Sequence, residues 1–179
     1  MRPAHAKSVG KRRFAAAAAV LLEPPPVSET IDILDHTGNT TIDITDITGV
    51  GIGNFNMITV TFKDATTSGS GSGVAKGVRV STDGGSIFIA TGYQRLTPGT
   101  VSDDTMIVQA AAGTPFDSIC RLINTDNPDI LTMFKSVRSG DQVVFGDIDS
   151  TLIAIDALQF VVVGGPTWTS GFITVQGYR

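Results

Sequence analysis

The segments "TIDILDHT" (residues 30–37) and "TTIDITDI" (residues 40–47) decide the fold class of this chain. In both, isoleucines alternate with polar residues at a period of two, which is typical of strands that bury one face. Gly38 and Asn39 lie between the segments, and this pair favours a tight turn. The sequence therefore predicts a β-hairpin at this point.

Further strand-like segments follow at short intervals, separated by Gly, Asp and Asn. This spacing is typical of sandwiches and jelly rolls. We therefore predict an all-β fold, a single antiparallel, jelly-roll-like β-sandwich over residues 30–179. The predicted strands are "FNMITVTFKDAT" (55–66), both halves of "VAKGVRVSTDGGSIFIATGY" (74–93) around a turn at 83–85, "DDTMIVQAAA" (103–112), "FDSICRLIN" (116–124), "ILTMFKSVRS" (130–139, with a short helix as the alternative), "QVVFGDI" (142–148), "LIAIDALQFVVV" (152–163) and "GFITVQGY" (171–178).

Charge is distributed unevenly along the chain. The 179 residues include 13 Lys and Arg and 17 Asp and Glu. Residues 1–13 hold five of the basic residues and no acidic one, so the rest of the chain has a net charge of −9. An acidic domain of this kind is not expected to bind nucleic acid. A short basic arm suits an acidic protein surface, a phosphate backbone or a membrane.

The segment "GKRRFAAAAAVLLEPPP" (residues 10–26) has two interpretations. A basic cluster followed by the apolar residues 14–22 is the pattern of an export signal, but no small-residue cleavage site follows it. The apolar run is also far shorter than the roughly 20 residues of a membrane span. The other interpretation is an anchoring arm, residues 1–29, that is extended or forms a short helix ordered by docking. We expect the arm, with an export signal and a frayed tail as alternatives.

The arm residues fall into three groups with different expected roles. Basic side chains pair with acidic groups of a partner, apolar side chains are buried against it, and prolines form a stiff spacer. The basic group is Lys11, Arg12 and Arg13, the apolar group is Phe14, Val20, Leu21 and Leu22, and the spacer is Pro24, Pro25 and Pro26.

The sequence contains no pattern that predicts catalysis, a cofactor or a metal ion. Cys120 is the only cysteine, so it forms no intrachain disulfide, and its apolar neighbours predict a core position. His36 is expected to flank a turn at the surface, because no nucleophile motif accompanies it. Acidic pairs match no calcium loop, and turn capping explains most of them. We therefore expect no catalytic, cofactor-binding or metal-binding residues.

Trp168 is the only tryptophan and lies in the loop-like segment "GGPTWTSGF". An exposed indole ring here is a candidate contact to a host receptor, such as a glycan, or to another subunit. Alternatively, the ring folds back and caps the sandwich. The exposure of this one side chain distinguishes the two interpretations.

Two stretches carry a family resemblance. "STDGGSIFIATGY" (81–93) is similar to an S-x-x-G-G-S-x-y-x-x-G-Y turn, and "IAIDALQFVVVGGPTWTSGFITVQGYR" (153–179) to an A-I-D-x-I-x-F strand, a Gly-containing loop and a closing x-x-G-x-I-x-L-Y-G strand. Together they resemble small β-rich virion proteins of tailed bacteriophages. Gln176 departs from the pattern, which usually has Tyr there. The resemblance covers roughly residues 30–179, without the arm, and the matching residues are Ala154, Ile155, Asp156, Phe160, Ser170, Gly171, Ile173 and Gly177.

The resemblance implies a structural or attachment component of the virion without enzymatic activity, assembled in the host cytoplasm. We expect the arm to bind capsid, portal-adaptor or tail subunits and the sandwich to project outward, as in a tail fibre, spike or other appendage involved in host attachment. A head fibre or capsid decoration protein is the alternative. The family also implies a homo-oligomer, with a trimer favoured.

Two hypotheses come from other classes of protein. A secreted carbohydrate-binding module requires that the N-terminal segment be cleaved. A polysaccharide depolymerase requires carboxylates that converge in a cleft. The carboxylates in question are at least two of Asp103, Asp104, Asp126, Asp147 and Asp149.

Overall fold

Antiparallel strands form nearly all the regular structure that the computed structural model describes. The described residues are 24–69, 75–90, 93–97, 99–103, 106–110, 115–123, 133–138, 143–148 and 155–179. The elements are β1 (Val27–Asp32), the 3-10 helix η1 (Ile33–His36), β2 (Thr41–Ile44), β3 (Asp46–Ile47), β4 (Val50–Gly51), the 3-10 helix η2 (Ile52–Asn54), β5 (Met57–Thr67), β6 (Ala75–Ser81), β7 (Tyr93–Thr97), β8 (Gly99–Asp103), β9 (Met106–Ala110), β10 (Phe116–Ile123), β11 (Met133–Arg138), β12 (Val143–Ile148), β13 (Ala157–Val163) and β14 (Trp168–Tyr178).

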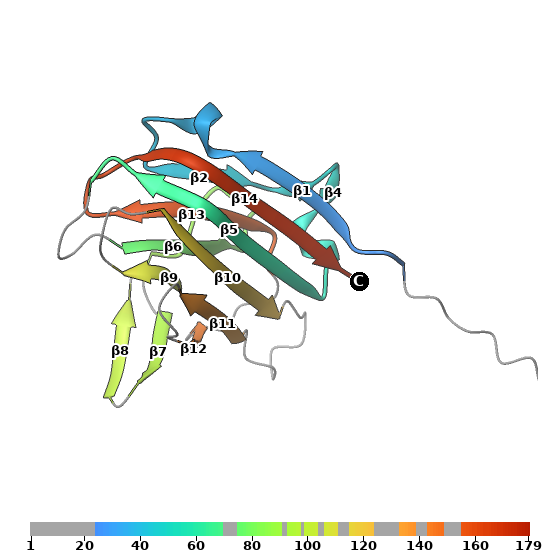
Figure 1. Cartoon of the computed structure of the whole chain (residues 1–179). Coiled ribbons are helices and arrows are strands. Elements are labelled where there is room, and N and C mark those ends of the chain that lie inside the picture. Colours follow the sequence, from blue (N-terminus) through green and yellow to red (C-terminus); the bar gives the residue numbers. More distant parts are fainter. Residues whose placement is uncertain are drawn as a thin grey trace, which may run out of the picture.

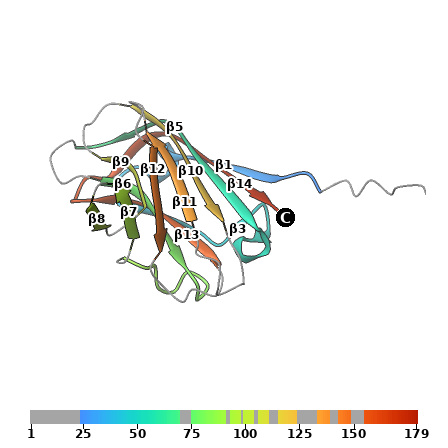
Figure 2. The same cartoon turned by 90° about the horizontal axis from the view of Figure 1, so that it is seen from below.

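Two antiparallel sheets pack against each other and enclose the core (Figures 1 and 2). The larger sheet has eight strands in the order β1-β14-β5-β10-β11-β12-β7-β8, and the smaller has four in the order β2-β13-β6-β9. A short ribbon of β3 and β4 stands beside them. The predicted all-β antiparallel sandwich is confirmed.

The prediction of a β-hairpin at the start of the domain is wrong. β1 pairs with β14 in the larger sheet, whereas β2 pairs with β13 in the smaller one. The chain crosses between the sheets through η1, which Asp32 caps by accepting a hydrogen bond from Leu34 N at 2.9 Å. Gly38 turns the chain with a φ of +91°, and its N–H donates to Trp168 O at 3.1 Å. Alternation identifies a strand, but it does not say which sheet the strand joins.

Other predicted strands are confirmed with shifted ends. β1 begins at Val27, so residues 27–29, which we assigned to the arm, belong to the larger sheet. Residues 133–138, the described part of the segment 130–139, form the strand β11 and not the alternative short helix. The prediction of a second strand within residues 74–93 is wrong for residues 86–90, which form no strand. The β7–β8 hairpin was not predicted, because its sequence lacks a clear apolar alternation.

An aromatic cluster joins the two sheets at the centre of the core. Phe62 on β5 lies 5.7 Å from Phe116 and stacks on Trp168 at 6.1 Å, measured between ring centroids. Phe160, on the smaller sheet, meets the Phe62 ring edge-on at 5.9 Å. Edge-to-face and offset aromatic pairs contribute about 0.5–1.5 kcal/mol each beyond their burial. We call Phe62, Phe116, Phe160 and Trp168 the aromatic cluster.

A bulge bends β5 and β14 close to this cluster. Asp64 has a φ of +50°, and the register between β14 and β5 shifts on both sides of Ser170. Asp117 accepts hydrogen bonds from Asp64 N at 2.8 Å and Lys63 Nζ at 3.0 Å, and these two contacts, in that order, lower the pKa of Asp117. Opposite the bulge, Gly171 has a φ of +104°, and a Cβ there would lie 2.5 Å from Asp64 O.

We expect the substitution Gly171→Ala to lower the free energy of unfolding by about 2–4 kcal/mol, since positive φ and close backbone contact both penalise a side chain. Gly165→Ala is the matched control, because Gly165 has a φ of +100° but no neighbour within 4 Å. Its expected loss is only about 1–2 kcal/mol. Chemical denaturation of both variants measures the difference. Equal losses would show that the contact with Asp64 contributes nothing.

Candidate functional site

The two stretches that carry the family resemblance meet at one turn. Gly84 N donates to Asp156 Oδ2 at 2.8 Å, and Asp156 N donates to Ser81 O at 2.9 Å. Gly85 N donates to Ser81 Oγ at 3.1 Å. Gly84 and Gly85 have φ values of +74° and +82°, a conformation that glycine adopts without strain. The two motifs therefore form one structural unit that ties β6 to β13.

Asp83 completes this turn from within. Its Oδ1 accepts hydrogen bonds from Ser81 Oγ at 2.7 Å and from Ile87 N at 2.9 Å. The bond from Ser81, followed by that from Ile87, lowers the pKa of Asp83. The carboxylates of Asp83 and Asp156 are thus engaged by their own turn, which is a structural role.

Trp168 is fully buried, which corrects the prediction that it is an exposed receptor or inter-subunit contact. Its ring stacks on Phe62, and its Nε1 donates to Phe160 O at 3.4 Å. Its backbone N donates to Asn39 O at 2.9 Å. The ring therefore packs back into the sandwich, as the alternative interpretation predicted. Composition suggested a loop here, but Trp168 is the first residue of β14.

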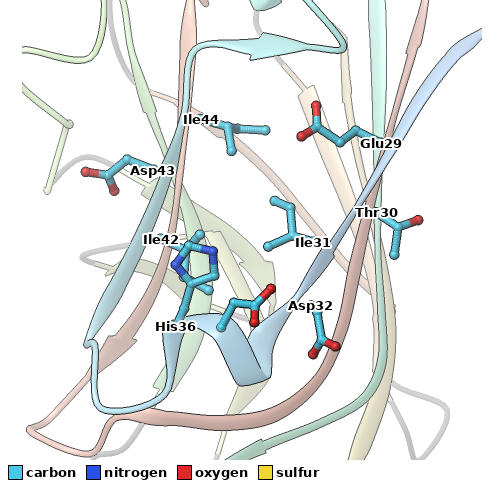
Figure 3. A pocket seen from close by; sticks show the side chains of 9 residues that line it. Glu29, Thr30, Ile31, Asp32, His36, Ile42, Asp43 and Ile44 are labelled. Atoms are coloured by element: carbon cyan, nitrogen blue, oxygen red, sulfur yellow. The ribbon is translucent and has the colours of Figure 1, made fainter.

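A groove of about 290 Å³ runs along the open side of the sandwich, between the edge strands β1 and β2 (Figure 3). We call it the β1–β2 groove. Its floor consists of Ile31, Ile42 and Ile44, and η1 closes one end. Ile31 and Ile44 are half-buried and pack against the core. Any apolar group in the groove would therefore extend the core.

The β1–β2 groove is acidic. Figure 3 shows the side chain of Glu29 pointing between the strands, whereas the carboxylates of Asp32 and Asp43 point away from the groove. Asp43 Oδ1 accepts a hydrogen bond from Gln159 Nε2 at 3.0 Å. Asp35 on η1 also lines the groove, and none of the described lysines or arginines does. Within the described part of the chain, none of these four carboxylates forms an ion pair. Glu29 Oε2 accepts from Thr48 N at 2.9 Å, which leaves its second oxygen open.

Lys76 is an unusual buried cation. It lies on β6 with the same orientation as the core residues Val78 and Val80, and only 1% of its surface is exposed. Its Nζ has no hydrogen-bond partner among the described residues. Burial lowers the pKa of the Lys76 amine, because the charged form loses its hydration. No solvent reaches this amine, so we assign it no part in binding.

Cys120 is fully buried, as predicted, and burial raises the pKa of its thiol to about 12. A thiol that stays protonated and enclosed is a weak nucleophile. Cys120 is therefore a core residue.

The carboxylates of the depolymerase hypothesis are only partly described. Asp103 lies on β8 and Asp147 on β12, and β7 separates the two strands. Asp104, Asp126 and Asp149 lie outside the described residues. Among the described residues, no three His, Cys, Asp or Glu side chains are grouped so that they could hold a metal ion.

Most of the predicted arm lies outside the described residues. This applies to Lys11, Arg12, Arg13, Phe14, Val20, Leu21 and Leu22. Pro24, Pro25 and Pro26 are described, and all three are exposed in a segment without regular structure.

Sequence reasoning missed the β1–β2 groove and the burial of Lys76. The groove depends on which strands form the sheet edges, which alternation does not reveal. Lys76 did carry a signal, since it stands at the same parity as Val78 and Val80 in "AKGVRVS". When a lysine occupies the same face of a strand as a run of apolar residues, the period-two pattern predicts that the lysine is buried.

Comparisons with known proteins give no assignment. No protein-family model matches the chain, and no curated protein matches it in sequence. No helix within the described ranges has the length and apolar character that crossing a membrane requires.

The fluorescence of Trp168 tests its burial directly, since the chain has no other tryptophan. We expect blue-shifted emission that acrylamide quenches weakly in the folded protein and strongly after unfolding in guanidinium. Strong quenching of the folded protein would mean that the ring is exposed, and the contact interpretation of Trp168 would return.

We expect Lys76→Met to raise the free energy of unfolding by about 1–3 kcal/mol at neutral pH, because it removes a buried charge that has no partner among the described residues. The folded chain binds the lysine proton more weakly than the unfolded chain, so wild-type stability rises as the pH increases towards 10.5, the ordinary lysine pKa. The variant should lack this rise. Denaturation between neutral pH and about pH 10 measures both effects.

The control is Arg121→Met, which removes the same charge from an exposed position on β10. Its stability should change by less than about 0.5 kcal/mol. If Lys76→Met destabilises the protein, the amine has a partner and the assignment of Lys76 as unpaired is wrong.

Proposed function

We propose that the protein is a non-enzymatic structural component of a phage virion, in which the N-terminal arm attaches a projecting β-sandwich. The foremost form of this proposal is a tail fibre, spike or other appendage protein involved in host attachment. The resemblance of residues 81–93 and 153–179 to phage virion proteins is its starting point. The contact between these two stretches through Asp156 supports treating them as one motif.

The position of the chain ends is the observation that best supports this function. Val27 on β1 pairs with Gly177 on β14, so the chain enters the sandwich beside the C-terminus (Figure 1). The first described residues and the C-terminus therefore lie at one end of the domain. A domain tethered at that end is free to project its whole length away from the attachment point.

A decoration protein is the second candidate, and two observations support it. The burial of Trp168 removes the residue from which we expected host contact. In addition, Ile119, Ile123 and Phe172 are exposed on the outer face of the larger sheet. An apolar face of this kind suits packing against neighbouring subunits.

The proposal that the protein is not an enzyme rests on how its described polar groups are used. Asp83, Asp117 and Asp156 accept hydrogen bonds from backbone N–H groups in turns or bulges. The one cysteine is enclosed in the core. These groups stabilise the fold and are not arranged around a cleft.

A cryo-EM map of the particle that contains the protein tests the proposal, with attention to residues 10–26. We expect these residues in contact with a capsid, portal-adaptor or tail subunit. If no particle contains the protein and its mature form begins after Leu22, the segment was an export signal. The secreted carbohydrate-binding module would then replace the virion proposal.

Arm variants identify the part of the chain that attaches. We expect the triple variant Arg12→Ala, Arg13→Ala, Phe14→Ala to lower the copies per particle by about tenfold or more, because charged and apolar contacts are lost together. The comparison variant Ile119→Ser, Phe172→Ser changes the sheet face and leaves the arm intact. Quantitative mass spectrometry of purified particles measures both. If only the Ile119→Ser, Phe172→Ser variant is present in fewer copies per particle, the protein does not attach through the arm.

A further inference from the structure

We infer that the β1–β2 groove binds the basic-apolar segment of the arm, residues 11–14, of a second copy of this chain. The groove combines an isoleucine floor with acidic residues, of which Glu29 points between the strands, and none of the described lysines or arginines lines it. The sequence "KRRF" combines three cations with one aromatic side chain in four residues. This inference depends on the proposed function in one respect only: both require that the mature protein keeps its N-terminal arm.

Charge complementarity is the first argument. Residues 1–13 carry five basic residues and no acidic one, and the remainder of the chain has a net charge of −9. Glu29 points between the two strands, Asp35 lines the same groove, and neither forms an ion pair with described residues. Opposite charges on two parts of one chain attract neighbouring copies to each other and fix the register of binding.

The apolar floor is the second argument. Ile31 and Ile44 are only half-buried, although both pack against the core residues of the sandwich. A phenylalanine seated on them would cover this surface, and burial of such a side chain is favourable. The pairing of an apolar floor with the carboxylates of Glu29 and Asp35 fits Phe14 together with its basic neighbours better than it fits a uniformly charged ligand.

The edge position of the groove is the third argument. β1 and β2 are the outermost strands of their sheets, so each presents backbone N–H and C=O groups without a partner strand. Exposed edges of this kind readily pair with an extended segment. An arm segment in the groove can therefore add backbone hydrogen bonds to its side-chain contacts.

The geometry of the linker favours a second copy over the same copy. Pro24, Pro25 and Pro26 are exposed and precede β1 directly, at the end of the domain where β14 terminates (Figure 1). Consecutive prolines favour a stiff, extended chain of about 3.1 Å per residue. Residues 14–26 extended would reach up to roughly 40 Å, enough to span to a neighbouring domain. Binding in the same copy requires the chain to reverse just beyond the prolines.

Cysteine cross-linking of full-length chains tests the inference. One chain carries Asp35→Cys at the groove and the other Ala15→Cys beside Phe14. Cys120 is buried with a raised thiol pKa and does not compete. We expect a disulfide-linked heterodimer when the two are mixed under mild oxidation. Replacing Asp35→Cys with Ser28→Cys, which is exposed on β1 but outside the groove, should abolish it.

A single chain with both Asp35→Cys and Ala15→Cys distinguishes the two topologies. Cross-linked dimers or larger species support exchange between copies. A product of monomer mass at every protein concentration would mean that the arm folds back onto its own groove. Absence of any cross-link would mean that the groove does not bind the arm. Either of these two results overturns the inference.

Sedimentation velocity of the purified full-length protein gives an independent measurement. We expect concentration-dependent self-association that Asp35→Lys weakens by about tenfold and that Arg12→Glu with Asp35→Lys partly restores. Ser28→Lys with Thr82→Lys makes the same change of charge at exposed positions outside the groove and should have no effect. A protein that is monomeric throughout, or a Ser28/Thr82 variant that is equally impaired, overturns the inference. These experiments need no particle, so their failure leaves the virion proposal untouched.

Discussion

The stacking of Trp168 on Phe62 is the contact on which the rest of the sandwich depends. Phe62 belongs to the larger sheet, and it meets Phe160 of the smaller sheet edge-on. The indole N–H then donates to the backbone of Phe160, so one side chain contributes both apolar burial and a polar tie between the layers. Because Trp168 also pairs with Asn39 through its backbone, the crossing segment after η1 is held against the same centre.

Polar contacts to the backbone fix the parts of the fold that hydrophobic burial leaves undetermined. Asp117 supports the bulge at Asp64, and Asp156 ties the glycine turn after β6 to the start of β13. Hydrophobic burial stabilises any arrangement that removes apolar surface from water. The hydrogen bonds to these carboxylates stabilise only one path of the backbone. They therefore fix the bulge between β5 and β14 and the place where the chain turns, which gives these aspartates a structural role.

Most strands could be predicted from the sequence, but the partner strand of each could not. Ile58, Val60 and Phe62 alternate along β5, and all three are fully buried, as a period of two requires. The same pattern in residues 30–47 could not reveal that β1 and β2 join different sheets, because both alternatives bury the same isoleucines. The floor of the β1–β2 groove follows from that choice of partners, so the groove could not be predicted either. Trp168 was misplaced for a related reason, since glycine-rich flanks look like a loop when the strand they accompany is bulged.

An arm that enters the groove of another copy makes a heterologous contact, in which two different surfaces of the same chain meet. Such contacts close into a ring when the rotation between copies returns to its start, and otherwise they continue as an open chain. The stiffness of Pro24–Pro25–Pro26 then matters more than affinity, since a rigid spacer fixes the rotation between domains whereas a flexible one permits several. The trimer expected from the family resemblance would, under our proposal, be a three-fold ring in which the basic arm of each chain meets the acidic groove of the next. Under this proposal, the direction of the prolines that precede β1 determines how many copies form the oligomer.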